Sequence, residues 1–239
     1  MTELKNKVAY ITGGSKGIGY GVAAALLAKG MKVAITSRSL EAAQKAAQNL
    51  SSDSTKVLAL QSDVSSLGSE EAAIEKAKNH FGAIDVLIAN AGVGHFGPID
   101  TLTEQEWKNT LDTNLTGVFN TVKAGIEALK TSKGYIITIA SLAGANFFEG
   151  GAAYNASKFG LVGFSQAIML DLRKYDIKVT TIMPGSVATE FADHTPTDAD
   201  AWKIQPEDIG QLVADLLGMH PRTLPSKVEV RPSKPGKAS

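Results

Sequence analysis

Short runs of β-branched and other apolar residues alternate along the chain with longer segments of helical periodicity. Most of the short runs are apolar throughout, which is typical of parallel strands covered by helices on both faces. A helical pattern such as residues 22–29 ends at a glycine, Gly30, which favours helix termination. The alternation predicts an α/β fold, a doubly wound parallel sheet of about seven strands with helices on both faces. The predicted strands are Val8–Thr12, Val33–Thr36, Val57–Gln61, Val86–Ala89, Tyr135–Ala140, Val179–Ile182 and Val228–Val230.

The chain has 239 residues, which fits one α/β unit better than two domains. Neither an internal repeat nor a linker interrupts the strand and helix pattern. We therefore expect a single domain over residues 1–231, followed by a flexible basic tail over residues 232–239.

Composition narrows the possible functions. The 24 Lys and Arg residues balance 24 Asp and Glu residues, so the net charge provides no attraction to nucleic acid or to an anionic membrane. The chain has no cysteine, which excludes disulfides and thiolate chemistry, and any redox chemistry must come from a bound cofactor. We expect a cytoplasmic protein, because there is no apolar signal segment and no run of membrane-spanning length. Its histidines are scattered without a metal-ligand spacing, so we assign no metal.

A glycine-rich segment, Thr12 to Gly19, joins the first predicted strand to the first predicted helix. Glycines there let backbone N–H groups approach a pyrophosphate at the helix N-terminus. No Gly-Lys-Ser/Thr follows, which excludes a kinase-type phosphate loop, and the spacing also departs from G-x-G-x-x-G. Such turns also occur for steric reasons, so this segment alone leaves both interpretations open. The candidate cofactor residues here are Gly13, Ser15, Lys16, Gly17, Ile18 and Gly19.

The second predicted strand leads into Ser37 and Arg38. In a Rossmann-like dinucleotide fold this position faces the adenosine ribose, and an acidic residue would bind its free 2′-hydroxyl. No acid is present, whereas a guanidinium beside hydroxyls suits a 2′-phosphate. The segment favours NADP(H) as the cofactor, the alternative being a solvated surface arginine.

Polar residues follow the fifth predicted strand and the helix after it. Ser141 ends the strand, and Tyr154 and Lys158 share one face of the following helix because they lie four residues apart. An ammonium close to Tyr154 is expected to lower the pKa of its phenol, so that Tyr154 can exchange a proton with a substrate oxygen that Ser141 orients. Each residue alone is more often structural.

In these motifs the chain resembles a short-chain dehydrogenase/reductase of the large subgroup with chains of this length. Within that subgroup its pattern is most similar to carbonyl reductases of the 3-oxoacyl-carrier-protein reductase type. The match runs from about Lys7 to Thr189 in continuous order. Its motifs are Thr-Gly-x-x-x-Gly-x-Gly at 12–19, Asn-Ala-Gly at 90–92, Asn114, Ser141 and Tyr-x-x-x-Lys at 154–158.

The resemblance implies roles that spacing alone does not give. Asn114, Ser141, Tyr154 and Lys158 would be the catalytic residues, with Asn114 positioning a water for proton relay. Asp63 and Val64 would hold the adenine, and Asn90 would stabilise the strand end beside the cofactor. The other cofactor contacts would come from Ala91, Gly92, Tyr154 and Lys158. Pro184, Gly185, Val187 and Thr189 match the turn that contacts the nicotinamide carboxamide. Lys16 and Arg38 would together mark a preference for NADP(H).

Substrate residues are expected after the Asn-Ala-Gly motif, after Ser141 and after the Pro-Gly turn. The candidates are His95, Phe96, Ala143, Phe147, Phe148 and Phe191. Such a pocket would favour a hydrophobic ketone or aldehyde, the alternative being that these phenylalanines pack in the core or between subunits. The last strand continues Val228-Glu229-Val230-Arg231-Pro232, where many 3-oxoacyl reductases have Val-Asp-Gly-Gly, which weakens an assignment to fatty-acid synthesis.

The sequence therefore predicts an NADPH-dependent carbonyl reductase that acts on a ketone, an aldehyde or a 3-oxoacyl thioester. One alternative is an NADP+-linked alcohol or sugar dehydrogenase that uses the same site in reverse. A second is a non-catalytic NADP(H) sensor, which would be expected to have lost an acid-base residue. The resemblance also implies a homotetramer assembled through helices corresponding to residues 112–131 and 153–174.

Overall fold

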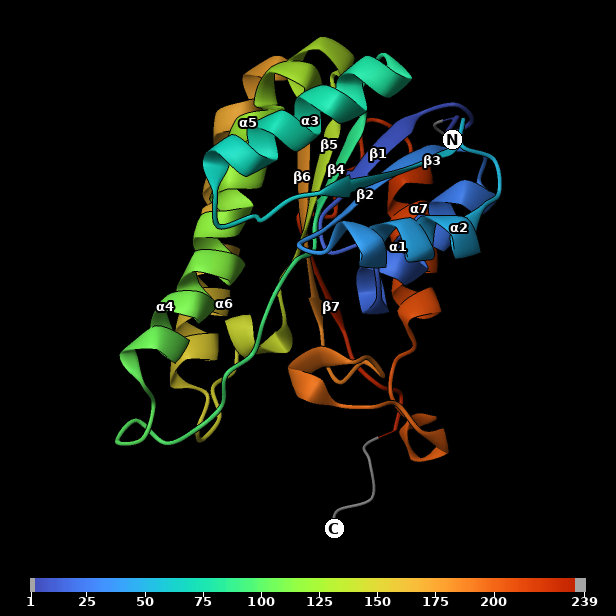
Figure 1. The fold of residues 1–239 in the computed structure, drawn as a ribbon. Helices are drawn as coiled ribbons and strands as arrows, with labels where there is room; N and C mark the ends of the chain where they lie inside the picture. The colour runs from blue at the N-terminus through green and yellow to red at the C-terminus, as the bar shows by residue number, and fades with distance from the viewer. Residues whose placement is uncertain (1–2, 235–239) are drawn as a thin grey trace.

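The computed structural model describes residues 3–234, in which seven parallel strands form one sheet in the order β3-β2-β1-β4-β5-β6-β7 (Figure 1). The strands are β1 (Val8–Ile11), β2 (Lys32–Ser37), β3 (Val57–Gln61), β4 (Val86–Ala89), β5 (Tyr135–Ile139), β6 (Lys178–Pro184) and β7 (Lys227–Val230). Every predicted strand is present, and the predicted fold class is confirmed. β6 is longer than predicted at both ends, because Lys178 pairs with Tyr135 of β5, and Met183 and Pro184 pair with residues 229 and 230 of β7.

Helices cover both faces of the sheet (Figure 1). One face buries apolar residues of α1 (Gly17–Ala28), α2 (Leu40–Leu50) and α7 (Pro206–Gly218). The other buries residues of α3 (Leu67–Phe81), α5 (Gly117–Ser132) and α6 (Ala152–Leu172). Both faces of each central strand are thus buried, which explains their continuous apolar runs.

Two helical details differ from expectation. The predicted helix over residues 112–131 is interrupted, because Asp112–Thr116 forms a turn of π-helix between α4 (Glu104–Leu111) and α5. Short 3₁₀ turns follow β5 at Leu142–Gly144, α6 at Arg173–Tyr175, and β6 at Phe191–Asp193 and Asp198–Asp200. Of the predicted tail, residues 232–234 follow β7 without regular structure, and residues 235–239 lie outside the described part.

No helix within residues 3–234 is long and apolar enough to cross a membrane. Over the same residues, no three His, Cys, Asp or Glu side chains are grouped so that they could hold a metal ion.

Candidate functional site

The glycine-rich segment forms the turn between β1 and α1. Gly19 packs so closely that a Cβ there would lie 2.4 Å from the Gly13 carbonyl oxygen and 2.6 Å from Asn90 Nδ2. Only glycine therefore fits this position. α1 begins at Gly17 without a side-chain cap from Lys16, so its first backbone N–H groups face the loop. A dinucleotide pyrophosphate fits this arrangement.

Hydrogen bonds join the carboxyl ends of β1 and β4, where the strand order reverses. Thr12 Oγ1 accepts bonds from the backbone N–H groups of Asn90 (3.0 Å) and Ala91 (3.1 Å). Asn90 Nδ2 donates to the carbonyl oxygens of Thr12 (2.9 Å) and Gly13 (3.1 Å). Ligands of open α/β sheets bind at such a reversal, so this junction positions the candidate site.

Arg38 lies exposed between β2 and α2. Its backbone carbonyl accepts a bond from Gln61 Nε2 (2.9 Å), and Ser39 caps α2 by accepting a bond from Ala42 N. Among residues 3–234, neither Arg38 nor the exposed Lys16 takes part in an ion pair. Both cations are therefore available to an anionic ligand.

Asp63 and Val64 follow β3, directly after Ser62, whose N–H donates to the Ser37 carbonyl at the end of β2 (3.0 Å). Asp63 Oδ1 accepts bonds from the N–H and the hydroxyl of Ser65 (3.0 and 2.7 Å). The Val64 side chain is buried, and its carbonyl accepts a bond from Asn120 Nδ2 (2.8 Å). The segment is held from both sides at the edge of the predicted adenine site.

The Pro-Gly turn returns from β6 to the glycine-rich segment. Gly185 N donates to the Val230 carbonyl (2.8 Å), and Val187 forms a β-bridge with Ile204. The Thr189 side chain then reaches within 3.3 Å of the position that a Gly17 Cβ would occupy. The turn thus lies against the loop that opens α1.

Asn114 lies fully buried in the π-turn and connects two segments. Its Oδ1 accepts a bond from Val93 N, and its Nδ2 donates to the Val93 carbonyl (both 2.8 Å) and to Ser157 Oγ (3.1 Å). A Cβ placed on Gly92 would lie 3.3 Å from Asn114 Oδ1 and 3.8 Å from Lys158 Nζ. Asn114 and Lys158 therefore meet beside the loop that follows β4.

Ser141, Tyr154 and Lys158 converge at the end of β5. Lys158 Nζ donates to the Ile139 carbonyl (3.1 Å) and lies over the Tyr154 ring, 5.6 Å from its centroid. Ser141 interacts with the Tyr154 hydroxyl and also accepts a bond from Ala143 N (3.1 Å). The structure thus brings together these three residues, which the sequence singles out.

The pKa of Tyr154 does not follow the sequence-based expectation. Burial raises the pKa of Tyr154 above its ordinary value, although Ser141 acts in the opposite direction. Burial also lowers the pKa of Lys158 to about 8. The expected lowering of the Tyr154 pKa by Lys158 is therefore wrong for these residues, because the ammonium bonds Ile139 and desolvation is the larger effect.

Three of the predicted substrate residues form an aromatic cluster with Tyr154. The Phe96 ring lies 5.3 Å from the Tyr154 ring, 5.9 Å from that of Phe148 and 6.3 Å from that of Phe191, between centroids. Phe191 in turn lies 5.6 Å from Tyr154. Phe147 is 87% exposed and has none of these ring contacts, so its role in substrate binding stays a prediction.

The other two predicted substrate residues lie beside the cluster. His95 is half-buried and lies near Glu106, whose pKa is lowered mainly by hydrogen bonds from Thr103 and to a smaller extent by His95. Ala143 is buried, and its carbonyl accepts a bond from Asn155 Nδ2 (2.8 Å). Asn155 was not a candidate, yet it also donates to the Asn146 carbonyl (2.8 Å) and so holds the loop before Phe148. Its position directly after Tyr154 is the one sequence feature that could have indicated a role for Asn155 in the site.

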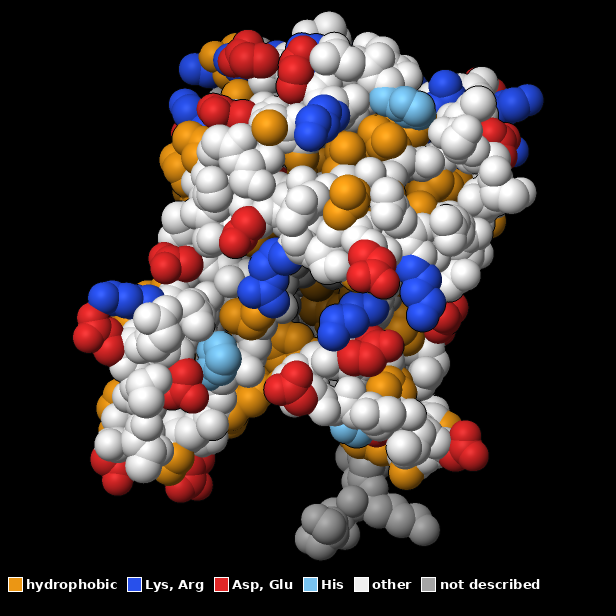
Figure 2. Space-filling view, in the orientation of Figure 1, with side chains coloured by type: hydrophobic (Ala, Val, Ile, Leu, Met, Phe, Trp, Pro, Cys, Tyr) orange, Lys and Arg blue, Asp and Glu red, His pale blue; other side chains and the backbone are white. Residues whose placement is uncertain are grey.

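Figure 2 shows a hollow in the molecule where the strands end, with hydrophobic side chains on its walls. Lys and Arg side chains lie on both sides of it, with Asp and Glu side chains next to them and below. The candidate cleft is therefore apolar inside and charged at its rim.

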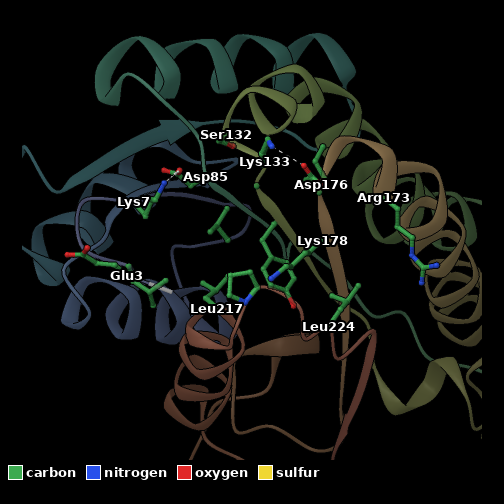
Figure 3. A pocket seen from close by; sticks show the side chains of 16 residues that line it. Glu3, Lys7, Asp85, Ser132, Lys133, Arg173, Asp176, Lys178, Leu217 and Leu224 are labelled. Carbon is green, nitrogen blue, oxygen red and sulfur yellow. Dashed lines mark hydrogen bonds and ion pairs between the residues drawn. The ribbon is translucent and has the colours of Figure 1, made fainter. Parts of the chain in front are cut away.

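A separate cavity of about 530 Å³ lies at the opposite end of the strands, where their amino ends meet (Figure 3). Its lining includes Asp85, Tyr135 and Lys178, at the amino ends of β4, β5 and β6. Ion pairs of Lys7 with Asp85 (2.8 Å) and of Lys133 with Asp176 (3.0 Å) cross its wall. None of the candidate catalytic residues lines it.

The sequence profile described as short chain dehydrogenase matches residues 7–200. The chain belongs to the short-chain dehydrogenase family. This confirms the resemblance seen in the motifs, and the protein is an oxidoreductase of that family.

Sequence relatives differ in their named activities. An uncharacterized oxidoreductase of Staphylococcus aureus is 34% identical over 234 residues, covering 97% of this chain and 100% of the relative. The 3-oxoacyl-(acyl-carrier-protein) reductase of Chlamydia muridarum is 36% identical over 190 residues, 79% of this chain and 77% of the relative. The glycine betaine reductase ATRR of Emericella nidulans is 35% identical over 213 residues, or 89% of this chain, but the chain spans only 17% of its length.

Solved structures share the fold across almost the whole chain. An alcohol dehydrogenase from the archaeon Thermococcus sibiricus, complexed with 5-hydroxy-NADP, has a TM-score of 0.90 and 29% identity, covering 96% of this short-chain dehydrogenase and 97% of that chain. A 3-ketoacyl-(acyl-carrier-protein) reductase from Brucella melitensis, complexed with NADH, has a TM-score of 0.88 and 26% identity, with coverage of 96% and 98%.

The Asn90→Ala variant tests the junction between β1 and β4. It removes both side-chain donors to the turn, so we expect the free energy of unfolding to fall by about 1–3 kcal/mol, measured by urea denaturation. Asn109→Ala is the matched control, because Asn109 is exposed on α4 and its side chain bonds only Gln105 among the described residues. We expect the control to change by less than about 0.5 kcal/mol. Equal stability of the two variants would contradict the role of Asn90.

Proposed function

We propose that this protein is an NADPH-dependent carbonyl reductase in which Tyr154 donates the proton. The observation that carries the proposal is the convergence of Tyr154, Ser141 and Lys158 beside the turn that suits a pyrophosphate. An acid, an orienting hydroxyl and a cation then surround the place where a carbonyl oxygen would gain negative charge.

The residues present fit a phosphorylated dinucleotide. Gly19 lets the turn pack tightly before the N-terminus of α1, and the exposed Lys16 and Arg38 supply charge without an acid at the end of β2. We assign the remaining contacts to Asp63 and Val64 at the adenine and to residues 184–189 at the nicotinamide. NADPH supplies the hydride when it is bound. The neighbour with 5-hydroxy-NADP supports this cofactor, while the one with NADH leaves the choice to the residues themselves.

Tyr154 holds the proton to be donated. Because burial raises its pKa, the phenol stays protonated at neutral pH and can donate to a carbonyl oxygen that becomes an alkoxide. Ser141 orients the same oxygen, and the Lys158 ammonium stabilises negative charge from beneath the ring. Asn114 fixes the loop after β4 against α6 and so sets the distance between cofactor and acid.

This protonation state favours reduction over the reverse reaction. An NADP+-linked alcohol or sugar dehydrogenase would need Tyr154 as a base, which a raised pKa disfavours. A non-catalytic NADP(H) sensor would have no need of four converging acid-base and positioning residues.

The named activities of the relatives include reduction of a 3-oxoacyl thioester and of glycine betaine, so a carbonyl substrate is our proposal and its identity is a separate question. We also propose a cytoplasmic homotetramer. Exposed Phe119 on α5 contacts Phe164 on α6 with 6.4 Å between ring centroids, which supports assembly through these two helices.

Tyr154→Phe removes only the donated proton. We expect turnover of a ketone with NADPH to fall by at least about 100-fold, with little change in NADPH affinity. Steady-state kinetics and fluorescence titration measure the two quantities. Tyr175→Phe, which alters an exposed tyrosine outside the cleft, is the control and should keep full activity. Turnover near the wild-type value in Tyr154→Phe would refute the mechanism.

The pH profile of reduction should report Lys158. Its pKa of about 8 means that the ammonium is charged at neutral pH and is lost as the pH rises through that value. We therefore expect kcat/KM for ketone reduction to fall above about pH 8. In Lys158→Arg the guanidinium stays charged, so its residual activity should not show this fall. A wild-type profile that stays flat from neutral pH to well above 8 would count against Lys158.

Cofactor choice depends on the end of β2. The double variant Ser37→Asp/Arg38→Ala replaces a cation with a carboxylate that repels a 2′-phosphate and accepts bonds from a free ribose. We expect the ratio of kcat/KM for NADPH to that for NADH to fall by about 30- to 1000-fold. The two cofactors are compared on one ketone in both proteins. An unchanged ratio, or a wild type that prefers NADH, would show that Arg38 does not bind the 2′-phosphate.

A further inference from the structure

The aromatic cluster of Phe96, Phe148, Phe191 and Tyr154 lies where a substrate would reach the acid. Its three phenylalanines remain 49%, 48% and 36% exposed, although each contacts another aromatic ring. They come from three separate connecting segments, outside the strands and the α-helices, and Phe191 opens a short 3₁₀ turn. Gly94 permits their approach, because a Cβ there would lie 2.6 Å from Phe191 Cε1 and 2.8 Å from Phe96 Cζ. Exposed ring faces beside the reacting group indicate contact with a ligand.

The same three loops carry an uncompensated negative charge. Residues 93–103, 145–151 and 189–194 contain four carboxylates and neither Lys nor Arg. All four are exposed, and none takes part in an ion pair within residues 3–234. The four are Asp100, Glu149, Glu190 and Asp193. Glu190 Oε2 lies 3.8 Å from the position that a Gly17 Cβ would occupy, so it belongs to the glycine-rich turn. The rim carboxylates are the other three, of which Glu149 directly follows Phe148 and Asp193 lies two residues after Phe191.

A neighbouring carboxylate, Asp200, shows that unpaired carboxylates are not general in this part of the chain. Asp200, only a few residues beyond the third loop, is paired with His194 (2.8 Å) and Lys203 (2.6 Å). At the cofactor end, around the glycine-rich turn and the end of β2, the two exposed cations Lys16 and Arg38 outnumber the one carboxylate, Glu190. The loops of Phe148 and Phe191 therefore carry net negative charge, whereas that part of the cofactor end carries net positive charge for the 2′-phosphate.

This combination selects among carbonyl substrates by charge. A neutral ketone would use the rings but gain nothing from the carboxylates, and an anionic acyl carrier would be repelled by them. A quaternary ammonium group gains from both, since the faces of aromatic rings carry negative charge density and attract a weakly hydrated cation. Resting on the proposed reductase function, we infer that the substrate is a small ketone or aldehyde that carries an ammonium group close to its carbonyl.

A matched pair of ketones isolates the charge. Acetonyltrimethylammonium and 4,4-dimethylpentan-2-one have the same shape, with a quaternary nitrogen in one and a quaternary carbon in the other. We define the cation preference as the ratio of their kcat/KM values with NADPH. Because the ammonium also activates the carbonyl chemically, the preference is compared between wild type and variants rather than interpreted alone.

The rim variant Glu149→Gln/Asp193→Asn removes two carboxylates, and asparagine tolerates the left-handed backbone of residue 193 (φ 61°). We expect its cation preference to be at least about tenfold lower than that of the wild type. The control Glu71→Gln/Asp215→Asn changes the net charge equally on α3 and α7 and should keep the wild-type preference. A rim variant that retains the full preference would overturn the inference.

Binding without turnover separates this inference from the proposed function. Calorimetry on Tyr154→Phe saturated with NADPH should show the ammonium ketone binding at least about tenfold more tightly than the neutral one, with the difference reduced at high salt. Equal or tighter binding of the neutral ketone overturns the inference, even if the wild type reduces both. Tight binding of the cation with no NADPH oxidation by the wild type would instead refute the reductase function and leave the charge selectivity standing.

Discussion

The hydrogen bonds between the carboxyl ends of β1 and β4 determine where everything else in the site can lie. The strand order reverses there, so the segments that follow β1 and β4 leave the sheet in opposite directions. Their backbone N–H and C=O groups then need hydrogen-bond partners. Thr12 and Asn90 satisfy those groups reciprocally, with four bonds between 2.9 and 3.1 Å. The turn before α1 and the loop that leads to Val93 are thereby fixed relative to each other. The cofactor end and the catalytic end of the cleft are then built outward from this junction.

Beyond the junction, hydrogen bonds of Asn114 hold the loop that follows β4 in place against α6. Its amide is fully buried and bonds both backbone groups of Val93 as well as Ser157, one residue before Lys158. The π-turn is what aims this side chain inward, because the extra residue rotates the helix that begins at Gly117. Lys158 and Tyr154 are consequently held in a buried setting that alters the pKa of both. Burial keeps the Tyr154 phenol protonated, and it lets the Lys158 ammonium lose its proton at mildly alkaline pH. Both effects suit a proton donor that works in the direction of reduction.

The fold was predictable because its signals are local. Runs of apolar residues marked each strand, and the glycine-rich segment together with Tyr154 and Lys158 could be identified from residue type and spacing. Three features were not accessible in that way. The pKa of Tyr154 depends on how deeply both partners are buried, which no spacing reveals. Phe147 and Phe148 are adjacent and identical, yet only Phe148 packs on Phe96, because the loop that Asn155 holds turns one ring inward and the other outward. The charge of the rim becomes visible only when three distant loops are brought together.

Hydride transfer to a carbonyl at this site is the central claim, and isotope transfer tests it most directly. The protein is incubated with a ketone and NADPH that carries deuterium at the reactive position of the nicotinamide ring, and the alcohol is analysed by mass spectrometry and NMR. The account predicts one deuterium on the carbinol carbon of a single enantiomer, because the cofactor and Tyr154 approach the carbonyl from fixed directions. An alcohol that lacks the label, or no alcohol from any ketone or aldehyde tested, would contradict it.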